Sequence, residues 1–393
     1  MATEPEFHKA EEERDGEAPI HGDILESILS HVPLIDLVPV LQVSKSWNRA
    51  VSSSLAHLNP IKPWLMVYTH TSRAPHVINT HAYDPRSRAW VQMREPSAVR
   101  PTVASLRSSH SSLLYMLSST ALAFSFDPIH LTWHHADAPR VCRTDPIVAL
   151  VGHHIVVAGG VCEFEDDPLA VEIYDLRRRT WDTCESMPAI LKGSATSTWL
   201  SVAVVGHRMH VTEKISGVTH TFHPEKNTWQ GPYDLRPDQS VYSIVNGTLR
   251  DRVIVAGLVG EAAEVKSVKL WEVRGEWGPE SKLRCEEMCE MPKEMVKKVK
   301  GEGGLVSSIS MSTTGDSVYI YNPSEPEWVM GCEIVNGICK WESVENEAVK
   351  DGGRLQRMVV GVGDVRMEDL QKGLKENRSF ALKQRNQKVN LVR

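Results

Sequence analysis

The amino-acid sequence predicts a mainly β protein, in which a closed ring of six four-stranded sheets, a β-propeller, follows a small unit of three helices. An aromatic residue and a tryptophan recur seven positions apart in YDPRSRAW (83–90), FDPIHLTW (126–133), YDLRRRTW (174–181) and FHPEKNTW (222–229). Short apolar runs bounded by Gly, Asp and Pro lie between the copies, and such runs are typical of strands. Between residues 20 and 51 the apolar spacing changes to about 3.6, the period of a helix.

The repeat has the period of a propeller blade. Two altered copies follow the first four, WEVRGEW (271–277), which is one residue short, and IVNGICKW (334–341), which lacks the aromatic residue. Intervals of 43, 48, 48, 48 and 64 residues separate the six tryptophans, Trp90, Trp133, Trp181, Trp229, Trp277 and Trp341. A period in the forties that holds several short strands is typical of a blade, so we predict six blades.

The third copy shows the order of strands within a blade. Its four runs are IVALVG (147–152), HIVVAGG (154–160), AVEIYD (170–175) and TWDTCESMP (180–188). The Asp-Pro pairs at 84–85 and 127–128 suit a type I turn, because Asp caps the turn and Pro presets φ. We expect the aromatic residue to end the third strand and the Trp to open the fourth, both buried against the neighbouring blade. These tryptophans are therefore expected to be structural.

The ring is expected to close with a strand from near the C-terminus. WLMVY (64–68) corresponds to the second strand of a blade, and no first strand precedes it. LQRMVVGVG (355–363) is an apolar run without a blade of its own. We expect this late strand to complete blade one, because closure removes an exposed sheet edge. The alternative is an additional edge strand.

Three short helices are expected before the propeller. Asp23 is a plausible N-cap of the first, with Glu26 as its capping-box partner, and Pro33 ends that helix. Asp36 can cap the second helix, which places Pro39 where its missing N–H has no intrahelical partner. About forty residues of short helices expose more apolar surface than they can bury alone, which indicates a docking module.

This helical segment resembles an F-box, the motif that docks a receptor onto the Skp-type adaptor, and through it the cullin, of SCF ubiquitin ligases. The resemblance lies in ILESILSHVPLIDLVPVLQVSKSW (24–47), with Pro33-Leu34, Leu37 and the run Val43–Trp47, although Ile20-His21 stand where the family usually has Leu-Pro. It implies that Trp47 packs a small core. The adaptor-binding residues that it implies are Ile24, Leu25, Ile28, Leu29, Pro33, Leu34, Leu37 and Leu41. A plain helical cap on the propeller is the alternative.

The blades resemble kelch repeats, which end a hydrophobic run with two glycines before the aromatic residue and the Trp. Only blade three carries the full pattern, in VVAGG (156–160). The whole chain resembles plant F-box/kelch-repeat proteins, in particular the receptors that target chalcone synthase and other phenylpropanoid or flavonoid enzymes. NPIKPWL, WDTCESMPAILK and GPYDLRP carry that likeness. It implies a non-catalytic substrate receptor whose propeller selects a protein for ubiquitination and proteasomal degradation.

Target recognition is expected in the loops between second and third strands, which gather on one face of a propeller and tolerate variation. Blade one offers His70 and Arg73 there, and blade three offers Phe164 and Asp166. Loops that only increase solubility are the alternative.

Composition excludes several other classes of function. A net charge of −6 argues against a nucleic-acid binder, and no segment is apolar and long enough to span a membrane. Seven cysteines without a CxxC pair indicate reduced thiols, and the N-terminus lacks a secretory signal, so a cytoplasmic or nuclear protein is expected. The histidine pairs make poor chelates on strands, so we expect no metal and no cofactor. A propeller enzyme with a helical cap and a ubiquitin-independent scaffold remain alternatives.

The expected organisation is a disordered acidic segment (1–19), the F-box (20–60), the propeller (61–366) and a basic tail (367–393). Met367, Leu370 and Leu374 have helical spacing, so a short helix on the propeller is plausible in a tail that is otherwise solvated.

Overall fold

The computed structural model describes residues 20, 22–71, 78–94, 104–110, 113–162, 167–278, 282–350 and 356–383. The chain divides into two compact units, Met1–Ile61 and Lys62–Arg393. The first is helical and the second is built mainly from strands. Among the described residues, none of the helices combines the length and the apolar character needed to cross a membrane.

The helical unit contains the three expected helices, α1 (Gly22–Leu29), α2 (Leu34–Val40) and α3 (Lys45–Ser53), and a π-helical turn, η1 (Ser54–Leu58). Ser44 caps α3, because its Oγ accepts the backbone N–H of Trp47 at 3.2 Å. The expectation that Asp36 caps α2 is wrong. Pro33 is the N-cap, so Asp36 lies inside the first turn, where its charge still favours the helix N-terminus, and Pro39 lies within the helix.

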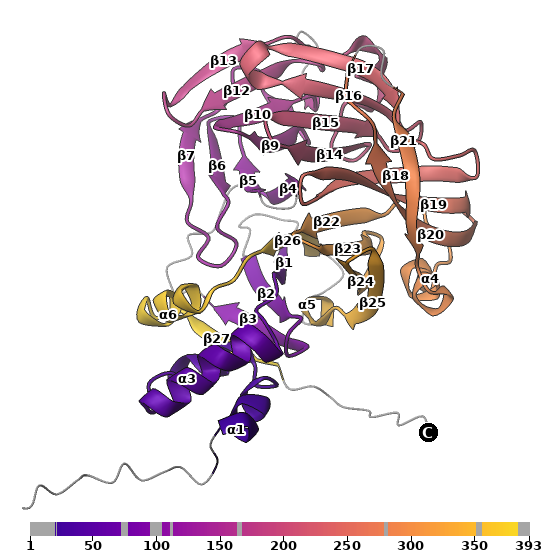
Figure 1. Ribbon diagram of the computed structural model, residues 1–393. Helices are drawn as coiled ribbons and strands as arrows, with labels where there is room; N and C mark the ends of the chain where they lie inside the picture. The colour runs from indigo at the N-terminus through magenta and orange to yellow at the C-terminus, as the bar shows by residue number, and fades with distance from the viewer. Residues whose placement is uncertain are drawn as a thin grey trace, which may run out of the picture. The chain divides into compact units, whose positions relative to one another are not determined.

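The second unit is a six-bladed β-propeller, as predicted (Figure 1). The strands of blades one to three, from the centre outward, are β26 (Gln356–Gly363), β1 (Trp64–Thr71), β2 (Ile78–Asp84), β3 (Ala89–Arg94) and β27 (Ser379–Leu382); β4 (Leu106–His110), β5 (Leu113–Leu117), β6 (Ala121–Ser125) and β7 (His134–Asp137); and β9 (Ile147–Val151), β10 (His154–Ala158), β12 (Val171–Asp175) and β13 (Thr180–Cys184). A two-stranded sheet, β8 (Arg143–Thr144) with β11 (Val161–Cys162), accompanies blade three.

Blades four to six have the same four-stranded order. Their strands are β14 (Leu200–Val205), β15 (Arg208–Glu213), β16 (Val218–His223) and β17 (Thr228–Asp234); β18 (Val241–Leu249), β19 (Arg252–Glu261), β20 (Glu264–Arg274) and β21 (Arg284–Glu290); and β22 (Ser310–Thr314), β23 (Ser317–Asn322), β24 (Glu325–Val335) and β25 (Ile338–Glu345). The helical segments between and after them are η2 (Ala189–Ser194), η3 (Pro224–Lys226), α4 (Lys293–Lys300), α5 (Glu347–Lys350) and α6 (Met367–Lys375).

The late strand closes the ring, which confirms the prediction. β26 pairs antiparallel with β1 along its length, from Trp64 opposite Gly363 to Thr71 opposite Gln356. It therefore supplies the innermost strand of blade one and covers an edge that would otherwise be exposed.

The aromatic pair of the repeat lies where the sequence places it in blades one, three and four. The paired rings, with the distances between their centroids, are Tyr83–Trp90 at 5.4 Å, Tyr174–Trp181 at 5.3 Å and Phe222–Trp229 at 4.9 Å. In each pair the aromatic residue and the Trp face each other across the third and fourth strands. The predicted contact with the neighbouring blade includes a hydrogen bond, because each indole N–H donates to a carbonyl at the end of the preceding blade's outer strand.

Blades two and five depart from the predicted pairing. In blade two Phe124, not Phe126, lies opposite the fourth strand and stacks on His134 at 5.4 Å. In blade five Trp277 lies between β20 and β21 and contacts Tyr233 of blade four. Both hairpins have longer connections than blade three, so a fixed seven-residue spacing no longer places the Trp opposite its partner.

The two glycines of blade three permit a close approach of backbones. Gly159 and Gly160 have φ angles of 68° and 102°. A Cβ atom on Gly159 would lie 2.3 Å from the carbonyl oxygen of Ala195. Only glycine adopts this conformation without strain and leaves room for the connection from β13 to β14.

The C-terminal segment is more ordered than the sequence indicates. The expected helix is present as α6, with Met367 and Leu370 buried. The expectation of an otherwise solvated tail is wrong as far as Leu382, because β27 adds a fifth strand to the outer edge of β3. Arg378 donates to the backbone carbonyls of Ile129 and His130, so the segment is also bonded to blade two.

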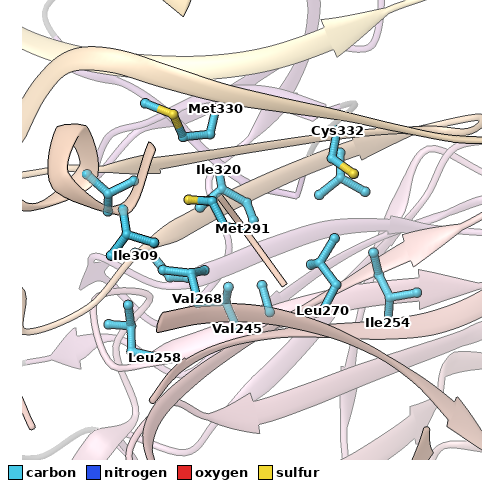
Figure 2. Close-up of a cluster of buried hydrophobic side chains, with 14 of the residues drawn as sticks. Val245, Ile254, Leu258, Val268, Leu270, Met291, Ile309, Ile320, Met330 and Cys332 are labelled. Atoms are coloured by element: carbon cyan, nitrogen blue, oxygen red, sulfur yellow. The ribbon is translucent and has the colours of Figure 1, made fainter. Parts of the chain in front are cut away.

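Most of the apolar core lies between blades. Figure 2 shows one such cluster, which is formed by strands of blades five and six together with Met291. Its fully buried members include Val268, Leu270, Ile320 and Met330. Blades three to six each bury both faces in such clusters, so each depends on its neighbours for stability.

Candidate functional site

The eight residues predicted to bind an adaptor differ in their exposure. Leu25, Leu29, Leu34 and Leu37 are buried, and Pro33 and Leu41 are half-buried. Ile24 and Ile28 are exposed, at 67% and 47% of their surface. In the described conformation, the four buried leucines are core residues, and direct contact with a partner falls to the others.

The exposed isoleucines form a row on α1. Ile24 and Ile28 are four residues apart, so they lie on one side of the helix, and the exposed Ile20 precedes it. Val43, in the connection from α2 to α3, is exposed at 61% and was not among the predicted site residues. Adjacent large aliphatic side chains in water mark an interaction surface.

Hydrogen bonds within the helical unit hold this row in place. Ser53 Oγ donates to Glu26 Oε2 at 2.7 Å and thereby joins α3 to α1. The expectation that Asp23 caps α1 with Glu26 as its partner is wrong, because α1 begins at Gly22 and Asp23 lies in its first turn. Asn59 Nδ2 donates to the carbonyl of Ser30 at 2.9 Å, which fixes the turn after α1. The surface is therefore presented by a small bonded scaffold.

Of the four predicted target-binding residues of the propeller, the structure describes one. His70 lies in β1 with no exposed surface, so the expectation that it is a loop contact is wrong. The reason is that β1 continues to Thr71 and pairs on both sides, which places His70 opposite Ile78 and Arg357. Arg73, Phe164 and Asp166 lie outside the described residues.

Large apolar side chains are exposed in and beside the connections of blades three and four. We call them the blade three–four surface; they are Val161 in β11, Ile190 in η2, Trp199 before β14 and Ile215 after β15. Trp199 is exposed at 51% and falls outside the tryptophan period of the repeat. Its carbonyl accepts the backbone N–H of Lys214 at 3.0 Å, so Ile215 follows close by.

A polar network holds Trp199 in position. Asp145 accepts hydrogen bonds from Arg107, Ser197 Oγ and Thr198 Oγ1 at 2.6–2.8 Å. Lys214 Nζ donates to the carbonyl of Thr198 at 2.7 Å, and burial lowers the pKa of Lys214 to about 8. The segment before β14 is thus anchored on both sides of its chain.

The central channel offers little room for a substrate. Its cavity measures about 110 Å³ and is lined mainly by polar residues, among them Ser201, Lys214, Asn246 and Ser312. Small-molecule sites usually enclose roughly 300–1,000 Å³. The described part of the channel therefore gives no support to an enzyme active site.

The adjacent histidines His153 and His154 lie near a carboxylate, that of Asp175. The Nε2 atoms of His153 and His154 each lie 3.8 Å from Asp175 Oδ2. Asp175 already accepts bonds from the backbone N–H groups of Arg177 and Arg178 and from the Arg178 guanidinium, which lower its pKa. These bonds assign the carboxylate to the turn between β12 and β13.

Comparison with known proteins agrees with both units. Residues 22–58 match the F-box domain family. An F-box/kelch-repeat protein of Arabidopsis thaliana is 43% identical over 375 residues, which cover 93% of this chain and 94% of the relative. A second Arabidopsis protein named for the same repeats is 22% identical over 250 residues, which cover 58% of this chain and 62% of that protein. The chain has a matching F-box and six blades, and it is 43% identical to an F-box/kelch-repeat protein over nearly its whole length. It therefore belongs to the F-box/kelch-repeat proteins.

Proposed function

We propose that this protein is the substrate-recognition subunit of an SCF-type ubiquitin ligase. The row of exposed isoleucines on α1 carries the proposal, because a separate helical unit with an apolar face is suited to docking. The partner is a Skp-type adaptor and, through it, a cullin. Ile24, Ile28, Pro33 and Leu41, together with Val43, form the contact surface, while the buried leucines maintain its shape.

The propeller then binds the protein that is to be ubiquitinated. We assign this role to the blade three–four surface, because exposed tryptophan on a rigid scaffold is the residue type that most often dominates a protein interface. The loop residues Arg73, Phe164 and Asp166 remain candidates beside it. Chalcone synthase is the proposed target, which rests on the likeness to receptors of flavonoid enzymes, and the consequence is its proteasomal degradation.

The adaptor contact is tested with the double substitution Ile24→Asp/Ile28→Asp in the full chain. Both side chains are exposed, so folding is retained, whereas Leu37→Asp would place a charge in the core. Burial of each isoleucine contributes about 1.5–3 kcal/mol, so we expect adaptor affinity to fall at least about tenfold per substitution. Ile338→Asp, at an equally exposed isoleucine of the propeller, is the control. Unchanged adaptor binding by the double variant would refute the contact.

The target and its fate are tested in cells by measuring the half-life of chalcone synthase. The intact protein should shorten it, and the Ile24→Asp/Ile28→Asp variant should bind the enzyme yet lengthen it. Trp199→Ala should weaken capture of the enzyme while adaptor binding stays intact. Capture without any change in half-life would support the scaffold alternative, and no capture by the intact protein would exclude chalcone synthase as the target.

A further inference from the structure

Three cysteines from two blades meet at one point of the propeller. Cys289 lies on β21 of blade five, and Cys332 and Cys339 lie on β24 and β25 of blade six. Their Sγ atoms all lie within 4.8 Å of one another. Cys332 is buried and the other two are half-buried. Figure 2 shows Cys332 at the same end of its cluster as Leu270, which is the strand partner of Cys289.

The hairpin of blade six brings two of the thiols together. Cys332 pairs with Trp341, and Cys339 pairs with Ile334. Cys339 is two residues from Trp341, and Cys332 is two residues from Ile334. The two cysteine side chains are therefore diagonal neighbours on the same face of the sheet. The two-residue turn at Asn336-Gly337, with φ angles of 53° and 77°, fixes this register.

A β-bulge brings in the third thiol. Cys289 pairs with Leu270 and Glu287 with Trp271, so Met288 is an extra residue in β21. Strict alternation would place Cys289 on the same face as Cys285, four residues earlier. Instead Cys285 packs into the core between blades four and five, and Cys289 packs into the core between blades five and six. The bulge turns Cys289 toward the blade six pair.

A buried donor lies beside the three sulfurs. Trp341, the strand partner of Cys332, has a buried Nε1 that bonds no acceptor among the described residues. A thiolate in the cluster would give this N–H an acceptor. Cys289 and Cys339 are each partly exposed, so the cluster is not sealed from solvent.

We propose that Cys289, Cys332 and Cys339 bind a single thiophilic d10 metal ion, Zn²⁺ or Cu⁺, that links blades five and six. Three thiolates match the low coordination number of Cu⁺, and they match Zn²⁺ when water or an added ligand takes the fourth position. Zn–S bonds of about 2.3 Å place tetrahedral sulfurs roughly 3.8 Å apart, so small side-chain rotations suffice. Each thiol loses one proton as its Sγ bonds to the ion, and up to three protons pass to solvent.

The site is tested with the reduced full chain, using Co²⁺ as the spectroscopic probe for Zn²⁺ and a separate titration with Cu⁺. We expect one ion per chain, a thiolate-to-cobalt charge-transfer band, displacement of Co²⁺ by Zn²⁺, and a higher melting temperature with the ion bound. Binding should weaken as pH falls, because protons compete for the thiolates. Cys289→Ser and Cys339→Ser should remove the band and the rise in melting temperature.

The matched control is Cys285→Ser, which changes a half-buried thiol on the same strand outside the cluster. This variant should bind the ion as the unchanged protein does. Retention of Cu⁺ alone would support the site and assign the ion to copper. Absence of both ions, equal loss of binding in Cys285→Ser and Cys289→Ser, or a disulfide between two of the three thiols in place of metal binding would overturn the proposal.

Discussion

At the end of β10 the backbone passes so close to the β13–β14 connection that a side chain on Gly159 would meet the carbonyl oxygen of Ala195. Gly206 offers a matched comparison, because it has a φ of 58° but no atom within 4 Å of a Cβ. Gly206→Ala should cost about 1–2 kcal/mol of unfolding free energy from the left-handed conformation. Gly159→Ala should cost a further 1–3 kcal/mol or so from the clash. Urea unfolding of both variants measures the difference, and equal losses would contradict this account.

Single residues also show where sequence reasoning ends. The packing of Trp90, Trp181 and Trp229 opposite an aromatic residue was predicted from their spacing, because a fixed separation across a short hairpin determines which residues are cross-strand partners. One indication in the sequence separates Trp199 from the structural tryptophans, namely that it lies outside the tryptophan spacing of the blade repeat. His70 was misplaced because the end of a strand depends on its pairing partners, which lie far away in the sequence.

At the scale of elements, the C-terminal segment gives the clearest prediction. A chain that ends after residue 366 loses α6 and β27, and with them the burial of Met367 and Leu370. Two buried side chains of this size contribute about 3–6 kcal/mol as an upper estimate, so the propeller should melt at a lower temperature. A chain that ends after residue 383 keeps both elements and should melt as the full chain does. Equal melting of the two shortened chains would show that the segment does not stabilise the ring.

The two late elements differ in how well the sequence predicts them. β26 was predicted because blade one lacked a first strand and the apolar run at 355–363 belonged to no blade. Each of these two observations accounts for the other. The helix α6 followed from its apolar period. β27 has only four residues, and its pairing with β3 depends on the free outer edge of that strand rather than on its own pattern. The three-cysteine cluster was missed for a similar reason, since a bulge in β21 reversed the expected alternation.

At the scale of the whole molecule, buried histidines make stability depend on pH. Burial lowers the pKa of His210 to about 3 and that of His110 to about 4, and also lowers the pKa of His220. Nearby Arg208 and His223 lower that of His210 further. These groups are neutral in both states above pH 7, so they contribute no pH dependence there.

Below the ordinary histidine pKa of about 6.5, the unfolded chain takes up protons that the folded chain does not. The unfolding free energy should therefore fall from pH 6.5 to 4, by up to about 1.4 kcal/mol per pH unit for each such histidine. Denaturant unfolding across this range measures the slope, and His210→Gln should reduce it. A stability that stays constant down to pH 4 would contradict the burial of neutral histidines.

The closure of blade one also orders events during synthesis. The ribosome makes β1 at the start of the propeller, and the inner partner of β1 emerges only after all the other blades. Until residue 363 has left the ribosome, the nascent protein carries β1 with an open side that other chains can pair with. Any message that stops short of this point yields a product whose ring stays open, however well the other blades have folded. Translation of β26 thus decides whether a newly made molecule becomes a closed propeller or a substrate for chaperones and proteases.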